Sequence, residues 1–365
     1  MTRHHHQSRE FSPFRGSVMR IESLKAIYPN YRNVASSWRT HLWQIVVEVR
    51  TDTGVTGYGY GGGGLASLPI VNGHFNELLV GESLNSPEDV MRIWDCLYYE
   101  SLPYGRKGIA MMALSGVDLA LWDALGKAER RPVAELLGGV RKDRIDVYAT
   151  GPDSEWYAEL GVAGQKLTHR WAGRTDDAVE AASKARQVMG ADTKIMFDVY
   201  MSWDADVAVR MANDLSEFNV YWFEDVLTPD DLATLGNLRP KISPINLAGG
   251  EHEFGVVGFK DVAEHGSYDI WQPDITWCGG ITAGIRICEL ASQYGIPVVP
   301  HRGGEVWGLH LIAASNSCSN LAELVLGRQD TATDDLWVGN PAITDGKLSI
   351  SDHPGFGVQL NEAML

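Results

Sequence analysis

Apolar and polar positions along the first third of the chain predict a small antiparallel sheet followed by helices. Three apolar-rich runs have the pattern of strands, at residues 21–28, 42–51 and 55–60. Asp52-Thr53-Gly54 supplies a hairpin turn between the second and third runs. Helical stretches follow at residues 87–99 and 109–131, and in the second one apolar residues recur every three or four positions. Residues 19–140 are therefore expected to form an α+β domain.

After Gly138-Gly139 short apolar runs alternate with amphipathic stretches of helical spacing. Eight of the runs are candidate strands, at residues 145–149, 165–168, 194–199, 221–224, 245–249, 269–273, 298–300 and 321–326. Strands that alternate with helices are parallel strands joined by crossover helices, and eight of them suggest a barrel. We therefore expect an α/β fold: a (β/α)7–8 barrel of the TIM type over residues 141–330, capped by the N-terminal α+β domain.

The two ends of the chain lie outside these units. Residues 1–18, which include His4, His5 and His6, show no periodicity and are expected to form a loose N-terminus. Residues 331–365 follow the last candidate strand and are expected to return to the capping domain.

Five candidate strands of the barrel end in an acid or a histidine, in the order Asp198, Glu224, Glu251, Asp274 and His301. Successive members are separated by 26, 27, 23 and 27 residues, which is about one strand–helix unit each time. Because the carboxyl ends of barrel strands face one mouth, these side chains are expected to converge.

The first three members of this series, Asp198, Glu224 and Glu251, are expected to hold a metal ion. Three carboxylates in one mouth repel each other unless a cation lies among them, and carboxylate oxygens suit Mg²⁺ better than Zn²⁺. Any one of these acids could equally be a solvated loop residue or a helix N-cap. The regular interval favours the metal site. Asp274 on the strand next to His301 would fix the imidazole tautomer, which makes His301 a candidate general base.

The composition excludes several classes of partner. The formal net charge is −16 and no basic face is visible, which does not fit a nucleic-acid partner. No apolar run approaches the roughly 18 residues of a membrane span, and the N-terminus lacks the apolar stretch of a signal peptide. The four cysteines form no CxxC pair, which fits a reducing cytoplasm. An anionic substrate would need a local cation in so acidic a chain.

Several longer segments carry a resemblance to a known family. They are Ser115–Lys127 (SGVDLALWDALGK), Leu136–Gly139 (LLGG), Gly250–Glu253 (GEHE) and Pro354–Asn361 (PGFGVQLN). With the acid series, these segments resemble the enolase superfamily, mandelate racemase subgroup, from about residue 20 to the C-terminus. Within the subgroup the chain is most similar to the L-rhamnonate dehydratases and related acid-sugar dehydratases. By this resemblance Asp198, Glu224 and Glu251 match the Mg²⁺ ligands, and Asp274 and His301 match the base dyad.

The resemblance also implies roles for residues outside the acid series. Glu323 matches the family's acid that hydrogen-bonds the substrate carboxylate or enolate oxygen, and Lys166 matches the first lysine of a Lys-x-Lys motif. Thr168 replaces the second lysine, which disfavours two-base racemisation and favours dehydration by one base. The segment 302–305 (RGGE) departs from the small, serine-containing run that the rhamnonate dehydratases have after the base.

The resemblance implies Mg²⁺-dependent dehydration of a sugar acid, an aldonate, to a 2-keto-3-deoxy acid. His301 would take the proton from C2, and the protein would be a homo-oligomer. Three residues are candidate contacts to substrate hydroxyls: Arg39 and His41 in a capping loop, and His252 beside Glu251. One alternative is a sugar-acid cycloisomerase, lactone isomerase or epimerase of the same superfamily. The other is a catalytically dead binding protein.

Overall fold

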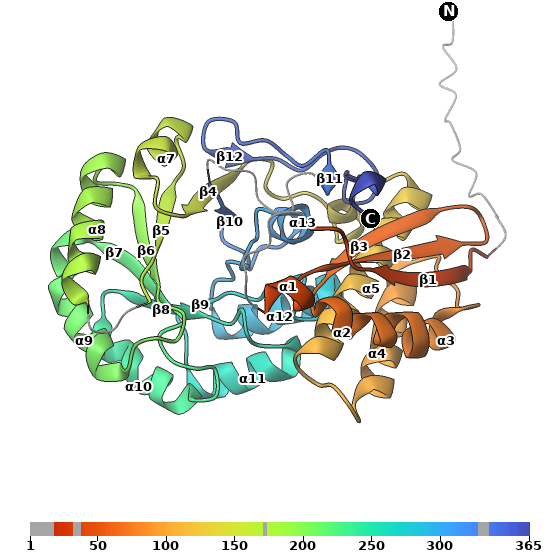
Figure 1. Ribbon diagram of the computed structural model, residues 1–365, viewed down its shortest axis with the longest axis horizontal. Coiled ribbons are helices and arrows are strands. Elements are labelled where there is room, and N and C mark those ends of the chain that lie inside the picture. The colour runs from red at the N-terminus through yellow and green to blue at the C-terminus, as the bar shows by residue number, and fades with distance from the viewer. Residues whose placement is uncertain (1–17, 32–37, 171–173, 328–335) are drawn as a thin grey trace, which may run out of the picture.

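A curved parallel sheet and a small antiparallel sheet lie side by side in the computed structural model of the protein (Figure 1). The structure describes residues 18–31, 38–170, 174–327 and 336–365. The expected loose N-terminus over residues 1–18 lies outside these ranges, except for its last residue.

The antiparallel sheet, with strand order β1-β2-β3, forms the core of the capping domain. Its strands are β1 (Ile21–Ile27), β2 (Ile45–Thr51) and β3 (Thr56–Gly61). The helices of this part are α1 (Arg39–Leu42), α2 (Gly64–Pro69), the π-helix η1 (Ile70–Phe75), α3 (Asn76–Leu79), α4 (Pro87–Ser101), α5 (Ile109–Glu129) and α6 (Val133–Leu136). The predicted strands and the two predicted helices are present. The helical run over residues 64–79 was not predicted.

Helix α5 is the core helix of this domain and packs closely on β3. Glycines in β3 allow the approach, because a Cβ atom at Gly59 would lie 2.0 Å from the carbonyl oxygen of Gly116. The helix is long and apolar enough to cross a membrane by those criteria alone, but 89% of its most apolar window is buried inside the protein. Burial of that kind is typical of a core helix.

The parallel sheet contains seven of the eight predicted strands, in the order β10-β4-β5-β6-β7-β8-β9. They are β4 (Ile145–Thr150), β5 (Gly164–Thr168), β6 (Lys194–Asp198), β7 (Val220–Glu224), β8 (Asn246–Gly249), β9 (Ile270–Trp271) and β10 (Leu321–Val325). Side chains from successive strands fill the inside of the curve: Tyr148, Met196, Trp222, Ala248, Ile270, Val299 and Leu321. These observations confirm an α/β fold with a curved parallel sheet and a capping domain.

Helices cover the outer face of the parallel sheet, as Figure 1 shows. They are α7 (Ser154–Leu160), α8 (Thr175–Met189), α9 (Ala205–Asp214), the 3-10 turn η2 (Ser216–Phe218), α10 (Leu232–Ile242), α11 (Gly255–His265), α12 (Gly280–Tyr294) and α13 (Val306–Ala314). Aspartates begin three of them, because Asp153, Asp204 and Asp231 each accept a hydrogen bond from a backbone N–H of the first turn.

A continuous ladder does not close the sheet into a ring within the described residues, which differs from the expected closed barrel. The predicted strand at 298–300 pairs only through isolated bridges, between Val298 and both Trp271 and Cys318. Pro297 and Pro300 flank this run, and a proline has no N–H to donate to a ladder. The segment therefore lies between β9 and β10 without becoming a regular strand.

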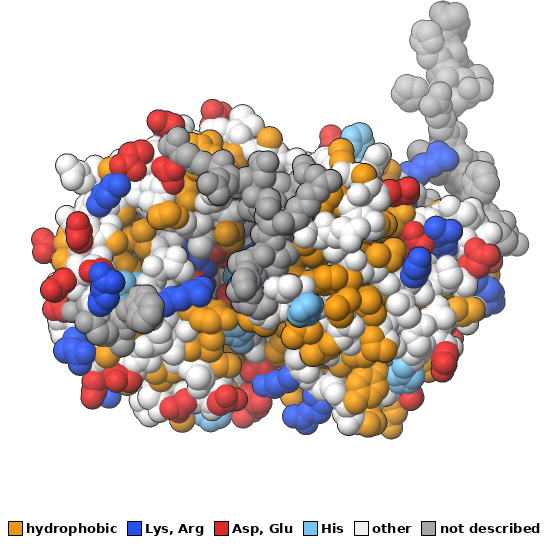
Figure 2. Space-filling model, in the orientation of Figure 1, with side chains coloured by type: hydrophobic (Ala, Val, Ile, Leu, Met, Phe, Trp, Pro, Cys, Tyr) orange, Lys and Arg blue, Asp and Glu red, His pale blue; other side chains and the backbone are white. Residues whose placement is uncertain are grey.

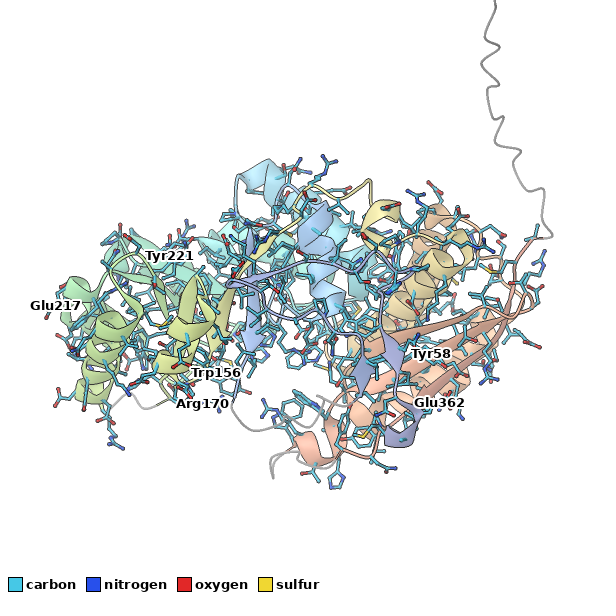
Figure 3. All side chains as sticks on the ribbon, turned by 90° about the horizontal axis from the view of Figure 1, so that it is seen from above. Tyr58, Trp156, Arg170, Glu217, Tyr221 and Glu362 are labelled. Atoms are coloured by element: carbon cyan, nitrogen blue, oxygen red, sulfur yellow. The ribbon has the colours of Figure 1, made fainter. Side chains whose placement is uncertain are left out.

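The last segment of the chain contacts both parts of the molecule. It contains β11 (Trp337–Val338), β12 (Lys347–Leu348), β13 (Gln359–Leu360) and the 3-10 turn η3 (Glu362–Met364). Strand β12 pairs with β4 of the parallel sheet. Near its end the segment lies on the capping domain, where Asn30 donates to the carbonyl oxygen of Met364 at 2.8 Å. Figure 3 accordingly shows Glu362 close to Tyr58 of β3.

Candidate active site

The carboxyl ends of the parallel strands open into one cavity of about 740 Å³, which also borders the capping domain. Figure 2 shows the surface hollowed between the two parts of the molecule. The sequence-predicted residues that line the cavity are Arg39, Lys166, Asp198, Glu251, His252, His301 and Glu323. Side chains from segments as much as 284 positions apart in the sequence (Arg39 and Glu323) therefore share this cavity.

Glu224 lies beneath this cavity at the centre of a hydrogen-bond cluster. It is directly opposite Asp198 in the register of β6 and β7, and its side chain is 1% exposed. Lys166 donates to one of its carboxylate oxygens. The other oxygen accepts hydrogen bonds from Trp222 Nε1 at 3.0 Å and from Gln272 Nε2 at 2.8 Å. The position of Glu224 is thus determined by three donors.

Glu251 follows β8, and its carboxylate contacts two imidazoles. Its Oε2 lies 3.1 Å from His301 Nε2, and its Oε1 lies 3.2 Å from His252 Nε2. Asp225 Oδ2 lies 3.5 Å from the same His252 nitrogen. Potential ligand atoms of Asp225, Glu251 and His252 all lie within 4.8 Å of one another. Asp225 was not among the predicted ligands, although its place directly after Glu224 could have indicated it.

The charges of this cluster fit a hard divalent cation. Burial and neighbouring carboxylates raise the pKa of Glu224 to about 7 and that of Glu251 to about 8. Asp225 Oδ2 is buried and has no hydrogen-bond partner among the described residues. A cation would relieve both the repulsion and the missing contact, and carboxylate oxygens are the ligands that Mg²⁺ prefers. The residues present therefore fit Mg²⁺.

His301 and Asp274, which the sequence analysis expects to act as a base dyad, are joined by a hydrogen bond. The hydrogen bond joins His301 Nδ1 to Asp274 Oδ2 at 2.8 Å, so that Nε2 points toward Glu251. Burial lowers the pKa of His301, but Glu251 and Asp274 outweigh burial and raise that pKa to about 10. His301 can act as a base at neutral pH only if its pKa is lower than this, which requires that the negative charge of Glu251 be neutralised by another group. A cation bound to Glu251 would neutralise that charge.

Lys166 and Glu323 form a second buried pair on the other side of the cavity. Lys166 Nζ lies 2.7 Å from Glu323 Oε1, and Thr150 donates a hydrogen bond to the same carboxylate. Burial opposes ionisation of Glu323, but Lys166 and His301 outweigh it and lower the pKa of Glu323 to about 2. Glu323 is therefore ionised at neutral pH and accepts hydrogen bonds rather than donating them.

The three predicted substrate contacts differ in their position. His252 lines the cavity, and its ring stacks at 6.3 Å on Trp277. Arg39 also lines the cavity, with its guanidinium between Trp38 and Trp43 at 4.9 and 5.1 Å from their ring centroids. His41 is exposed and is not one of the described residues that line the cavity.

Sequence reasoning missed a second guanidinium at the rim of the cavity. Arg170 lies over the ring of Tyr200 at 4.4 Å, and both residues line the cavity. The signal that could have found it is its place just after β5, where the Lys166 strand reaches the mouth. Figure 3 shows Arg170 near Trp156 on the barrel side.

A polar contact joins the capping domain to the dyad. Gln44 is fully buried at the start of β2. Its amide donates to Thr276 Oγ1 at 2.8 Å and accepts from Trp277 Nε1 at 2.9 Å. Thr276 in turn donates two hydrogen bonds of 2.8 Å, from its backbone N–H and its hydroxyl, to Asp274 Oδ1. The capping domain therefore holds the loop that orients Asp274.

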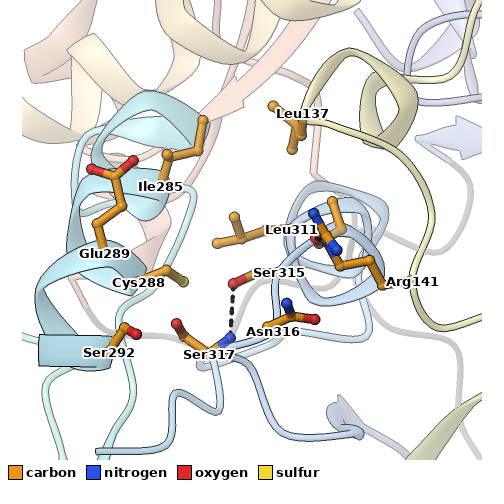
Figure 4. Close-up of a pocket in the computed structure, with 11 residues that line it drawn as sticks. Leu137, Arg141, Ile285, Cys288, Glu289, Ser292, Leu311, Ser315, Asn316 and Ser317 are labelled. Carbon is orange, nitrogen blue, oxygen red and sulfur yellow. Dashed lines mark hydrogen bonds between the residues drawn. The ribbon is translucent and has the colours of Figure 1, made fainter. Parts of the chain in front are cut away.

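A second cavity of about 370 Å³ lies between α12, α13 and the loop after α6 (Figure 4). Its polar lining residues include Arg141, Cys288, Glu289 and Ser315. None of the predicted site residues lines it. The chemistry described above therefore belongs to the larger cavity.

An acidic cluster that fits a cation, beside a histidine–aspartate dyad at the carboxyl ends of parallel strands, defines a class of metal-assisted barrel enzymes. Comparison with known families agrees. Residues 24–138 match the mandelate racemase / muconate lactonizing enzyme N-terminal domain, and residues 154–364 match the enolase C-terminal domain-like family. The chain belongs to the mandelate racemase and muconate lactonizing enzyme family of the enolase superfamily.

Named relatives and solved structures lie within the same family. The chain is 37% identical to L-rhamnonate dehydratase from Saccharopolyspora erythraea, over 93% of this chain and 89% of the relative. It superimposes on rhamnonate dehydratase from Gibberella zeae complexed with Mg with a TM-score of 0.85, at 28% identity and with 96% of each chain covered. The 3,6-anhydro-D-galactonate cycloisomerase from Zobellia galactanivorans gives a TM-score of 0.83 at 27% identity, with 94% of this chain and 97% of that chain covered.

Proposed function

We propose that the protein is an Mg²⁺-dependent hydro-lyase that dehydrates a sugar acid to a 2-keto-3-deoxy acid, with L-rhamnonate or a closely related aldonate as substrate. The observation that carries the proposal is the His301–Asp274 dyad, whose free nitrogen faces the cation-binding acids in the same cavity as Lys166. The similarity to an L-rhamnonate dehydratase over 93% of the chain supports the choice of substrate class.

The dyad moves one proton twice. His301 Nε2 takes the proton from C2 of the sugar acid, while Asp274 on Nδ1 holds the ring and stabilises the imidazolium. The imidazolium then gives that proton to the hydroxyl group leaving C3 on the same face. Water departs, a double bond forms between C2 and C3, and the resulting enol tautomerises to the 2-keto-3-deoxy acid.

Charged groups around the dyad hold the substrate and its developing charge. Lys166 donates to the oxygen that gains negative charge as the C2 proton leaves. Ionised Glu323 accepts a hydrogen bond from a substrate hydroxyl. Asp198 and Glu224, which are opposite each other on β6 and β7, would hold Mg²⁺ together with Glu251, and Asp225 beside Glu251 is a fourth candidate. When bound, the ion supplies positive charge that lowers the cost of removing a proton next to a carboxylate.

Residue types at the cavity favour one base. Thr168 stands at the end of β5, where a second base would be needed for racemisation, and a threonine hydroxyl cannot act as that base. His252, Arg39 and His41 remain our candidates for contacts to substrate hydroxyls. A second candidate function is cycloisomerisation of an anhydro sugar acid, which is favoured by the similarity to the Zobellia enzyme and also needs only one proton removed.

The test is a screen of aldonic and anhydro-aldonic acids with purified protein and Mg²⁺. L-Rhamnonate, L-lyxonate, L-mannonate, D-gluconate and 3,6-anhydro-D-galactonate are offered separately, and 2-keto acid formation is measured with semicarbazide. A signal that EDTA removes and Mg²⁺ restores supports the dehydratase. Turnover of the anhydro acid alone would assign the second function. Absence of both reactions from protein that binds Mg²⁺ would reject them.

Three further properties belong to the same proposal. We infer that the enzyme is cytoplasmic, with neither a nucleic-acid nor a membrane partner, because the chain is acidic and the one long apolar helix among the described residues is buried. The family resemblance alone supports the inference that it is homo-oligomeric. Light scattering of the purified protein measures the oligomeric state directly. The division into a capping domain over 19–140, a barrel over 141–330 and a returning segment over 331–365 is likewise our proposal, and limited proteolysis at these boundaries tests it.

A further inference from the structure

Arg302 directly follows the proposed base and makes three kinds of contact with the catalytic machinery. Its side chain is 9% exposed. Two nitrogens of its guanidinium meet the Asp274 carboxylate: Nε and Nη2 each lie 3.1 Å from Oδ2, and Nη2 also lies 3.5 Å from Oδ1. Nη2 also donates to the Thr276 hydroxyl. The backbone N–H of Arg302 donates to Glu323 Oε2 at 2.9 Å.

We propose that Arg302 is a positioning residue, which holds Asp274 in the orientation that His301 needs and holds Glu323 in place through its main chain. The inference rests on the proposed function, because it assigns a part in that reaction. Nothing in the acid series indicated it, since arginine is not a ligand or a base.

The argument begins with the shared oxygen. Asp274 Oδ2 accepts from both His301 Nδ1 and Arg302 Nε, at 2.8 and 3.1 Å. A planar guanidinium that meets a carboxylate with two nitrogens fixes the carboxylate plane as well as its charge. Thr276 alone would hold Oδ1 and leave Oδ2 to turn about that contact. The plane of the Asp274 carboxylate therefore depends on Arg302.

The backbone of Arg302 supports the same conclusion. Its φ angle is +51°, in the left-handed region, where a residue with a Cβ atom is strained. Glycine would avoid this strain. The left-handed turn directs the N–H toward Glu323. The main chain of Arg302 therefore contacts Glu323 while its side chain contacts Asp274.

Aromatic rings complete the seat of the guanidinium. Trp277 lies 5.3 Å and Trp43 lies 5.6 Å from the guanidinium carbon, measured to the ring centroids. Trp277 comes from the loop after β9 and Trp43 from the capping domain. A lysine ammonium is not planar and cannot contact the Asp274 carboxylate with two nitrogens or stack on these rings. R302K therefore keeps the positive charge and removes the geometry.

The first experiment compares R302K with a matched control, R239K, in the Mg²⁺-loaded enzyme. Arg239 also contacts an aspartate with two guanidinium nitrogens, with Nε 2.9 Å from Asp269 Oδ1, but it lies on α10 and outside the cavity.

The probe is L-rhamnonate with hydrogen or deuterium at C2. We expect kcat of R302K to fall about 100-fold, KM to change less than threefold, and the isotope effect on kcat to rise. A purely structural loss lowers the active fraction and leaves the isotope effect unchanged, which would overturn the proposal. R239K is expected to keep wild-type kinetics.

Chemical rescue adds a second readout. R302G removes the guanidinium and the backbone strain while it keeps the N–H that serves Glu323. We expect millimolar guanidinium ion to raise kcat of R302G at least tenfold over its value without added ion. Methylammonium is expected to leave kcat of R302G unchanged. Equal rescue by both ions, or by neither, contradicts a role for the two-nitrogen contact.

A crystal structure of R302G separates this proposal from the proposed function. We expect the Asp274 carboxylate to rotate and its distance to His301 Nδ1 to exceed 3.5 Å. An unchanged dyad in R302G would reject the proposal, whatever the substrate is. A wild-type enzyme without turnover of L-rhamnonate would instead reject the proposed substrate and leave the crystallographic result to decide on Arg302.

Discussion

Lys166 Nζ lies 2.7 Å from Glu323 Oε1. Lys166 belongs to β5 and Glu323 to β10, and β4 lies between these two strands in the sheet. Both side chains are almost completely buried, and Lys166 also donates to Glu224. One ammonium therefore contacts two carboxylates and offsets one of their two negative charges. The negative charge that remains, on this pair and on Asp198, Asp225 and Glu251, is available to a cation.

Removal of this ammonium is expected to destabilise the protein. Lys166→Met leaves the Glu323 carboxylate buried without its partner, and breaking a buried pair from one side costs about 3–5 kcal/mol. Urea unfolding measures this loss in the free energy of unfolding. Lys184→Met is the control, because the pair that Lys184 forms with Glu155 is more than half exposed and is screened by water, so little stability is expected to depend on it. Equal stability of the two variants would contradict the assignment.

Replacement of the proposed base is expected to remove turnover and keep the fold. His301→Asn retains a polar side chain next to Asp274 but cannot carry a proton between C2 and C3. General acid–base groups contribute about 10²–10⁴-fold, so we expect a loss of at least 10³-fold in kcat, since one residue acts twice. Circular dichroism and Mg²⁺ calorimetry show whether fold and metal binding persist. Turnover within tenfold of wild type would assign the base elsewhere.

Mg²⁺ affinity is expected to rise with pH. The raised pKa values of Glu224 and Glu251, about 7 and about 8, mean that protons occupy these carboxylates below those values. A metal ion must displace the protons, so affinity increases up to about tenfold per pH unit for each proton released. Isothermal titration calorimetry at pH 6 and pH 8 in buffers of different ionisation enthalpy gives both the affinity and the proton count. A pH-independent affinity with no proton release would contradict this account.

Stability on the acid side is expected to depend on His310. Its Nδ1 accepts a hydrogen bond from the backbone N–H of Ala134, and burial lowers its pKa to about 4. The unfolded chain takes up a proton near pH 6.5, and the folded protein does so only near pH 4. The stability is therefore fully present above pH 6.5 and is lost as the pH falls toward 4.

This loss amounts to about 2 kcal/mol between pH 7.5 and pH 5. In His310→Asn an amide oxygen still accepts the Ala134 hydrogen bond, but the group no longer titrates. Urea unfolding at the two pH values is expected to show a difference about 2 kcal/mol smaller in the variant than in the wild type. The same pH difference in both proteins would show that His310 does not titrate as described.

Docking of the capping domain is expected to depend on Gln44. Gln44→Leu removes one donor to the Thr276 hydroxyl and leaves the buried Trp277 indole N–H without an acceptor, at a cost of about 1–3 kcal/mol. Turnover is expected to fall as well, because Thr276 orients Asp274. Urea unfolding and steady-state kinetics measure the two effects. Gln359→Leu, at an exposed position of β13, is the control, and an equal response of both variants would contradict the role of Gln44.

The sequence predicted the strands well where a buried run ends in a candidate site residue. Strand β6 was expected at 194–199 and is Lys194–Asp198, and β7 was expected at 221–224 and is Val220–Glu224. The period of the pattern is set by burial, and these strands are buried on both faces. The helical run from Gly64 to Leu79 was missed because it begins in a glycine cluster and contains Pro69, both of which disfavour helix by themselves.

The candidate site could be predicted in part for a related reason. Residues at the end of a strand, such as Glu251 and His301, could be predicted from their position in the repeating strand–helix unit. Asp225 and Arg302 do not, because each takes its place through a left-handed backbone turn that follows the strand end, at φ angles of +49° and +51°. The turn places Asp225 beside Glu251 and Arg302 in the cavity, and no periodic pattern in the sequence indicates it.

The contact between Asn30 and the last residues has a consequence for biosynthesis. Asn30 Nδ2 donates to the carbonyl oxygen of Leu365, 335 positions along the chain, and Asp123 of the capping domain accepts from the backbone N–H of Phe356. The capping domain is thus completed by a segment that leaves the ribosome more than 200 residues later. During translation its sheet and α5 lack this partner until the barrel strands have been synthesised.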